Sequence, residues 1–154
     1  MARAPFQTLI IPFKLTEEGI RYAVFLRSDG NFWQWIAGGG EDDETPLEAA
    51  KREAFEEAGI PRDAEFLKLH SCNTVPVVGV IGCLMWGPDV LVVPEHCFGV
   101  RVDGFEIRLS HEHAEYRWVE YEEALSLLEF DSNKNALWEL NHRLSEYGSR
   151  EVQA

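Results

Sequence analysis

Apolar and polar residues alternate over short stretches of this chain, and residues that favour turns separate the stretches. Such alternation is typical of strands that bury one face. The first two strands are predicted at 6–13 and 20–27, followed by a strong turn signal in Ser28-Asp29-Gly30-Asn31. A run of β-branched and apolar residues predicts a fully buried strand at 75–85. Further strands are expected at 33–36, 65–71, 96–102, 106–110 and 115–120.

Helical spacing replaces this alternation in other segments, which predicts helices at 46–58, 121–128 and 134–147. The first of these has well-defined ends. Thr45 and Glu48 have the spacing of a capping box, and Gly59 is suited to the left-handed conformation that stops a helix. The buried stripe of this helix is expected to contain Leu47, Ala50, Ala54 and Ala58.

Composition limits the possible partners and compartments. The chain has 154 residues and a formal net charge of −13. This length predicts one domain over 1–154, with a frayed tail at 149–154. Nucleic acid and anionic membranes are disfavoured as partners because both attract basic surfaces. No targeting or membrane-spanning segment stands out. We therefore expect a cytoplasmic protein with three reduced core cysteines, Cys72, Cys83 and Cys97.

The helix at 46–58 carries an unusual group of acids. Glu53, Glu56 and Glu57 stand at i, i+3 and i+4, so they project from one face. Like charges at this spacing cost roughly 0.2–0.5 kcal/mol per pair, and acids in the last turn also oppose the helix dipole. A bound cation would offset both costs. Magnesium is the natural ion, since it prefers oxygen ligands and is usually held by carboxylates together with substrate phosphates.

The residues around this helix suit a phosphate ligand. Gly38-Gly39-Gly40 is expected to form a flexible run where the backbone approaches a ligand closely, which places Gly38 and Gly39 in the substrate site. Its carbonyl groups would be free to complete a metal shell. Arg52, beside the acidic face, can hold a carboxylate with two hydrogen bonds.

Residues 38–60 resemble the signature of the Nudix family, which are hydrolases of nucleoside diphosphates linked to another moiety. The signature reads Gly-x5-Glu-x7-Arg-Glu-U-x-Glu-Glu-x-Gly-U, with U a bulky aliphatic, and only Ala54 at the first U departs from it. The resemblance implies an α/β (α+β) fold, namely an αβα sandwich with a mixed sheet between helices. It also implies a Mg²⁺-dependent pyrophosphohydrolase, with Mn²⁺ as a substitute ion.

The same resemblance implies roles for individual residues. Glu56 and Glu57 would be the primary metal ligands, and the backbone carbonyl of Ala37 a further one. Glu53 would be a ligand or the general base. Two residues would assist by orienting the acidic face, namely Glu44 and Arg52.

Residues 110–118 resemble the Ser-x-Glu-His-x-Glu-Tyr-x-Trp stretch of one Nudix branch, which includes dihydroneopterin triphosphate pyrophosphatases and related nucleoside triphosphate pyrophosphohydrolases. In that branch the glutamate at the position of Glu112 adds a metal ligand or acts as base, so Glu112 rivals Glu53. A solvated loop acid is the alternative interpretation of Glu112.

Further matches to this branch predict the substrate side of the site, with Arg27, Trp33, Gln34 and Asn133 as substrate-binding residues. An aromatic ring beside an amide can stack on a purine or pterin and read its edge. Arg27 is suited to a terminal phosphate. The alternatives are packing for Trp33, a helix cap for Asn133 and an ordinary surface position for Arg27.

The expected substrate is a small polyphosphate, either a dNTP or dihydroneopterin triphosphate, cleaved to pyrophosphate and a monophosphate. Pro76 lies sixteen residues after Ile60, close to a marker of the ADP-ribose branch, so ADP-ribose or another nucleoside diphosphate derivative remains an alternative. A non-catalytic nucleotide-binding module is an alternative of another class, against which the intact glutamates argue. The sequence does not fix the oligomeric state, and a homodimer is one option.

Overall fold

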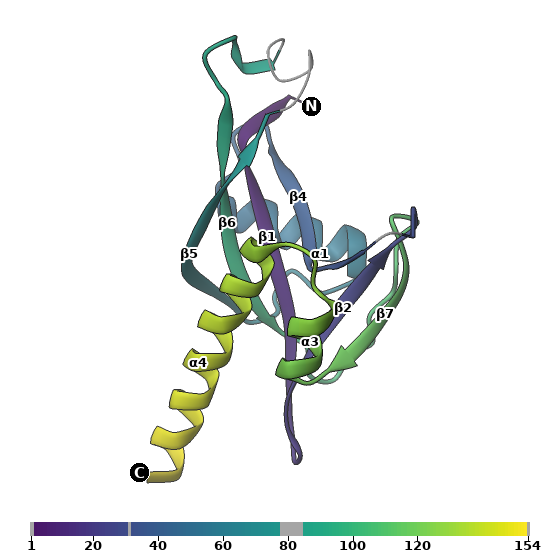
Figure 1. The fold of residues 1–154 in the computed structure, drawn as a ribbon, viewed down its shortest axis with the longest axis vertical. Helices are drawn as coiled ribbons and strands as arrows, with labels where there is room; N and C mark the ends of the chain where they lie inside the picture. The colour runs from purple at the N-terminus through teal and green to yellow at the C-terminus, as the bar shows by residue number, and fades with distance from the viewer. Residues whose placement is uncertain (1, 31, 78–84, 154) are drawn as a thin grey trace.

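The computed structural model describes residues 2–30, 32–77 and 85–153, and its strands form one mixed sheet between helices (Figure 1). The strands are β1 (Arg3–Thr16), β2 (Gly19–Arg27), β3 (Trp33–Gln34), β4 (Ile36–Glu41), β5 (Phe66–Pro76), β6 (Val92–Arg101) and β7 (His113–Val119). The helices are α1 (Pro46–Ala58), α3 (Tyr121–Leu127) and α4 (Asp131–Gln153). This confirms the α/β (α+β) class and the αβα sandwich.

Strand β1 organises the sheet. It pairs in parallel with β6 over residues 7–13, and antiparallel with β4 over residues 3–10 and with β2 over residues 13–16. Since β6 occupies one edge of β1, β4 and β2 must follow each other along the other edge. Strand β2 then pairs with β3 and β7. The sheet therefore forks along this edge of β1. Strand β4 forms one branch, and β2 with β3 and β7 forms the other.

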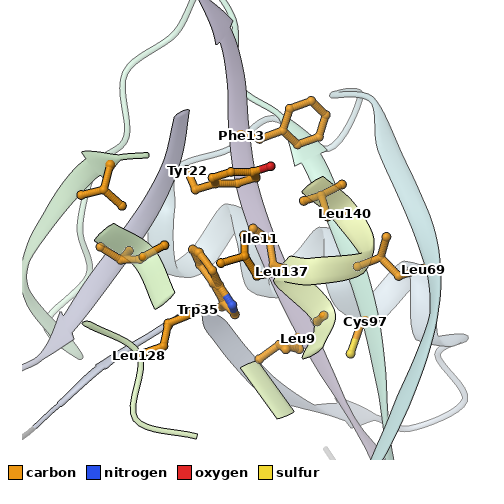
Figure 2. Close-up of a cluster of buried hydrophobic side chains, with 14 residues drawn as sticks. Leu9, Ile11, Phe13, Tyr22, Trp35, Leu69, Cys97, Leu128, Leu137 and Leu140 are labelled. Atoms are coloured by element: carbon orange, nitrogen blue, oxygen red, sulfur yellow. The ribbon is translucent and has the colours of Figure 1, made fainter. Parts of the chain in front are cut away.

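Each face of the sheet has its own core. Helix α1 lies behind the sheet, and α3 and α4 lie in front of it (Figure 1). The α4 side contains a cluster that includes Leu9, Tyr22, Trp35, Cys97 and Leu137, several of which are seen together in Figure 2. The α1 side contains a separate cluster, which includes Ile10, Phe25, Ala54, Ile60 and Phe98.

Two expectations about the acidic helix region were wrong. The glycine run is strand β4, and it is held against β1 rather than flexible. The strand needs glycines because a β-carbon on Gly40 would lie 2.2 Å from the ring of Phe6. Leu47 is exposed, and the buried stripe of α1 consists of Ala49, Ala50, Glu53, Ala54, Glu57 and Ala58. The buried face of this helix therefore consists of alanines and two glutamates.

Two predicted strands also differ from the structure. Residues 106–110 are irregular, because their N–H groups bond to the end of α1: Arg108 donates to the carbonyl of Ala58 and Ser110 to that of Glu57. The buried strand at 75–85 is contradicted at its start, since β5 ends at the exposed Pro76. The rest of that strand prediction lies mostly outside the described residues.

The remaining predictions concern the end of the chain and the cysteines. Helix α4 runs from Asp131 to Gln153, so its backbone is helical through most of the predicted frayed tail. Cys97 is buried as expected, but Cys72 is exposed, and Cys83 lies outside the described residues. Within the described part of the chain, no helix combines the length and apolar character needed to cross a bilayer.

Candidate active site

Helix α1 is fixed at both ends by the residues that the sequence indicated. The hydroxyl of Thr45 accepts from the backbone N–H of Glu48 at 3.2 Å, and the carboxylate of Glu48 accepts from the N–H of Thr45 at 2.9 Å. Gly59 ends the helix with a φ of 68°, and its N–H returns to the carbonyls of the last turn. The positions of the acidic side chains on α1 are therefore well determined.

Arg52 joins the acidic face to β4. Its guanidinium forms two hydrogen bonds to Glu44, at 2.9 and 3.1 Å, and one to the carbonyl of Gly39 at 2.8 Å. The remaining nitrogen donates to Glu53 at 2.9 Å and to Glu56 at 3.3 Å. Bonding to Arg52 lowers the pKa of Glu44, which stays ionised. This geometry matches the predicted orienting role of Glu44 and Arg52.

The predicted ligand glutamates lie at different depths. Glu53 and Glu57 are buried, whereas the side chain of Glu56 is 54% exposed. Glu53 packs against Gly38 so closely that a β-carbon there would lie 2.2 Å from the carboxyl carbon. Burial raises the pKa of Glu53. The glycine of the motif therefore makes space for a carboxylate beside β4.

Glu57 meets Glu112 from the segment before β7. The two carboxyl groups lie against each other, and one oxygen of Glu57, Oε2, is buried without a hydrogen-bond partner among the described residues. Burial, followed by the contact with Glu112, raises the pKa of Glu57 strongly, whereas the same contact lowers the pKa of Glu112. The deeper residue, Glu57, is therefore the one shifted toward its protonated form.

The turn that carries Glu112 is fastened from two sides. Ser110 donates its N–H to the carbonyl of Glu57 at 3.2 Å, which ties the turn to the end of α1. Ser28, directly after β2, donates its N–H to the carbonyl of Glu112 at 2.8 Å and its hydroxyl to that of His111. These bonds bring Glu112 to the acidic helix.

The backbone of Ala37 lies beside this acidic face. In a strand, carbonyl groups two residues apart point toward the same edge. The carbonyl of Gly39 points away from β1, toward Arg52, so the carbonyl of Ala37 points to that side as well. This orientation is compatible with the predicted ligand role of Ala37.

The residues predicted to bind substrate surround the fork of the sheet. Arg27 ends β2 beside Asp29 at 3.2 Å, and it is close enough to Glu112 to help lower the pKa of that carboxyl. Trp33 stands in β3 with the guanidinium of Arg117 4.8 Å from its ring centre. Gln34 contacts the ring of His113 at 3.2 Å.

Asn133 has a structural bond that the sequence did not indicate. Its side-chain oxygen accepts from the backbone N–H of Trp35 at 3.2 Å, and its backbone carbonyl accepts from the indole N–H at 3.0 Å. Asn133 therefore anchors the start of α4 to the chain between β3 and β4. A role in substrate recognition remains a prediction and would depend on its side-chain N–H group.

Sequence reasoning missed two residues that shape this region. Trp35 is fully buried and links Asn133 to the core. His113 is 4% exposed, and its Nδ1 has no hydrogen-bond partner within the part of the chain that the structure describes. The signal for Trp35 was its position two residues after Trp33. Residues two apart in a strand face the same side, so this spacing alone would place both tryptophans on one face of the sheet. For His113 it was the match of residues 110–118 to the branch stretch.

The acidic face suits a hard divalent cation by its chemistry. Its donors are carboxylate oxygens, and Oε2 of Glu57 is a buried acceptor without a partner. Nowhere among the described residues do three or more His, Cys, Asp or Glu side chains already form a metal cluster. Arg52 explains this, because it bonds to both Glu53 and Glu56. A bound cation would compete with this guanidinium for Glu53 and Glu56.

Comparisons with known proteins agree with this geometry. The NUDIX domain model matches residues 15–139. The dihydroneopterin triphosphate diphosphatase of Escherichia coli K12 is 31% identical over 113 residues, which cover 72% of this chain and 75% of the relative. The asymmetrical bis(5'-nucleosyl)-tetraphosphatase of Mus musculus is 30% identical over 146 residues, which cover 87% of this chain and 86% of that protein.

Solved structures show the same fold. A NUDIX hydrolase from Listeria monocytogenes is 42% identical and superposes with a TM-score of 0.83, covering 94% of this chain and 97% of its own. The dihydroneopterin triphosphate pyrophosphohydrolase of E. coli superposes with a TM-score of 0.74 at 22% identity, covering 93% of this chain and 99% of its own.

Proposed function

Because the chain belongs to the Nudix family of pyrophosphohydrolases, which act on acid anhydrides, we propose that it performs Mg²⁺-dependent hydrolysis of a nucleoside triphosphate-like substrate, a dNTP or dihydroneopterin triphosphate. The products would be pyrophosphate and a monophosphate. The observation that carries this proposal is the buried, unpartnered Oε2 of Glu57 beside Glu53 and Glu112. A buried acceptor of this kind is costly unless a ligand satisfies it.

Five groups are proposed to hold divalent cations, namely Glu53, Glu56, Glu57, Glu112 and the carbonyl of Ala37. Bound Mg²⁺, or Mn²⁺ in its place, would neutralise phosphate oxygens and make water a better nucleophile. Because burial and Glu112 raise the pKa of Glu57, metal binding there would displace a proton wherever Glu57 is protonated. Arg52 and Glu44 keep the acidic face oriented while this happens.

The proton of the attacking water needs an acceptor near phosphorus. Glu112 is exposed, and the contact with Glu57 keeps its pKa low, so it is ionised at neutral pH. Glu53 is buried with a raised pKa and bonded to Arg52. These environments favour Glu112 as the base and Glu53 as a ligand, since the base must reach substrate water.

The substrate side is proposed to lie at the fork of the sheet. Arg27 is placed to hold a phosphate near Glu112, and Gly38 and Gly39 let phosphate oxygens approach β4. Trp33 and Gln34, which contact Arg117 and His113, would receive the base together with Asn133. The name of the E. coli relative supports a pterin triphosphate.

A dinucleoside tetraphosphate is the second candidate substrate. It is favoured by the mouse relative, whose alignment covers 87% of this chain. The ADP-ribose alternative rested on Pro76, which the fold explains otherwise. Pro76 ends β5 at the edge of the sheet, where a missing N–H is tolerated.

A substrate panel with product identification tests the proposal. The purified chain is incubated with dihydroneopterin triphosphate, the four dNTPs, diadenosine tetraphosphate and ADP-ribose, each with Mg²⁺ and with excess chelator. We expect Mg²⁺-dependent release of pyrophosphate from a triphosphate. Turnover of diadenosine tetraphosphate alone would favour the second candidate, and turnover without divalent metal would contradict the mechanism.

A further inference from the structure

We call a row of residues that lie opposite one another on neighbouring strands a rung. One rung of the sheet consists of residues with no apolar side chain. Gly39 of β4 is opposite Gln7 of β1, Gln7 is opposite Glu95 of β6, and Glu95 is opposite Asn73 of β5. The rung therefore crosses four strands, and it begins at the glycine whose carbonyl binds Arg52. It connects the acidic face to the interior of the sheet.

The side chains of this rung point to the face that α4 covers. The rung two residues along, which faces the same side, contains Ala37, Leu9 and Cys97, which pack in the core on the α4 side. Residues two apart in a strand share a face, so Gln7 follows Leu9 and Glu95 follows Cys97. On this face of the sheet, the apolar rung of Leu9 and Cys97 is therefore followed by the polar rung of Gln7 and Glu95.

Glu95 is the unusual member of this rung. It is 6% exposed, and its Oε1 has no hydrogen-bond partner among the described residues. The neighbouring Asn73 does not satisfy it, since that amide is directed at the sulfur of Cys97 at 3.8 Å. Burial raises the pKa of Glu95. A buried acceptor that finds no donor among the described residues is a candidate for a donor supplied by a ligand.

The distance from Glu95 to the acidic face fits one nucleotide unit. Neighbouring strands lie about 4.8 Å apart, so two spacings separate Glu95 from Gly39 by about 10 Å. The side chains along this path are polar: Gln7 stands between the two positions, and the guanidinium of Arg3 lies over Gly39, where a β-carbon would be 2.4 Å from it. A phosphate near β4 and a base edge near Glu95 can therefore belong to one ligand.

We propose that Glu95 selects substrates whose base carries two adjacent N–H donors, a ring N–H beside an exocyclic amine. This is the 2-amino-4-oxo edge that guanine and pterins share. A carboxylate accepts both donors side by side. Adenine has a ring nitrogen acceptor next to its amine. The lone pair of that nitrogen would face a carboxylate oxygen, and two acceptors repel each other. The inference rests on the proposed function and narrows its substrate class.

Activity measurements with Glu95→Gln test this assignment. The values of kcat/KM are compared for dGTP, for dITP, which lacks the amine, and for dATP. We expect wild type to prefer dGTP and the variant to lose about 10- to 100-fold on dGTP while keeping its rate on dATP. Glu17→Gln, an exposed acid in the β1–β2 turn, is the matched control and should change nothing.

A binding measurement separates this inference from the proposed activity. Thermal shifts are recorded for wild type, Glu95→Gln and Glu95→Ala with GMP, IMP and AMP. We expect GMP to stabilise wild type most, and both variants to lose that preference while remaining folded in the absence of ligand. Equal losses on all three bases, or an unchanged preference for GMP, would overturn the role of Glu95. Preferential GMP binding without turnover would leave the role of Glu95 in place and reject the proposed reaction.

Discussion

Glu57 of α1 lies against Glu112 of the segment before β7; burial and this contact raise the pKa of Glu57, and the contact lowers the pKa of Glu112. A proton taken up by the pair is therefore expected on Glu57. The contact exists because Ser110 and Ser28 hold the turn of Glu112 against the end of α1 and the end of β2. In the metal-free protein such a proton would reduce the repulsion between acids. In the working enzyme a cation would replace it.

Glu57→Gln should abolish most of the activity. The substitution keeps the shape of the side chain but removes the charge that a divalent ion needs, so kcat should fall at least about 100-fold. The stabilisation of the fold by Mg²⁺, measured as a rise in Tm, should disappear as well. Glu17→Gln in the exposed β1–β2 turn is the control. Turnover like that of wild type in Glu57→Gln would reject the ligand role.

Glu112→Gln tests the choice of base. Positioned bases contribute about 10²- to 10⁴-fold to a rate, so we expect a loss of kcat in that range while the fold and the KM for substrate are retained. Glu115→Gln, which changes an exposed acid in β7, should be neutral. If Glu112→Gln keeps its rate and its metal dependence, Glu112 is neither base nor ligand, and Glu53 becomes the remaining candidate.

Arg52→Lys should weaken the site without removing its charge. Lysine cannot reproduce the two bonds to Glu44 together with the bond to the carbonyl of Gly39. We expect a loss of about 1–3 kcal/mol in unfolding free energy and a higher Mg²⁺ concentration for half-maximal rate. A double-mutant cycle with Glu44→Gln should show coupling between the two residues. Strictly additive effects would contradict the bridging role.

Glu139 should make stability depend on acid pH. Its carboxylate accepts from the backbone N–H groups of His70 and Ser71 at 2.7 Å each, where the β5–β6 register shifts. Burial alone would raise the pKa of Glu139, but these bonds, with others from the Ser71 hydroxyl and Arg143, outweigh it and lower the pKa to about 2.

The folded-state pKa of Glu139 lies below its ordinary value of 4.5, so its stabilisation is complete above about pH 4.5 and is lost as the pH falls toward 2. The loss should be on the order of 2–3 kcal/mol. Denaturant unfolding at several pH values should show this slope in wild type and a flatter one in Glu139→Gln. Equal slopes in both proteins would contradict the assignment.

Gly38→Ala and Gly39→Ala form a matched pair. The added carbon at Gly38 would meet the carboxyl of Glu53, which Arg52 holds in place, whereas at Gly39 it would meet the end of the Arg3 side chain. We expect a clearly larger loss of Tm for Gly38→Ala, because Arg3 can move aside and Glu53 cannot. Equal losses of Tm would show that the Glu53 contact is not the reason for glycine.

Local features of the acidic helix could be predicted because they depend on neighbours in sequence. Thr45, Glu48 and Gly59 form caps through bonds within one turn. The i, i+3 and i+4 spacing of Glu53, Glu56 and Glu57 places them on one face of α1 in any setting. The sequence also predicted that Arg52 holds a carboxylate with two hydrogen bonds, and the structure identifies this carboxylate as Glu44.

Features that depend on distant strands could not be predicted in the same way. Alternation and composition cannot show that residues 106–110 would bond to the end of α1 rather than to a strand. Equally, Leu47 lies on the correct helical face for burial by spacing alone, but it is exposed in the structure. Spacing gives the face of a helix and not what packs against it.

The sequence by itself determined the family, the capped helix and its acidic face, because each of these is encoded within residues 38–60. Only the tertiary structure decided the states of the acids. The pKa of Glu57 is raised because the fold buries it and places Glu112 against it, and Oε1 of Glu95 has no hydrogen-bond partner among the described residues, which include its sheet neighbours Gln7 and Asn73. The pKa and the pairing of a carboxyl group depend on burial and on neighbours in space, and both are set by the packing of segments far apart in the chain.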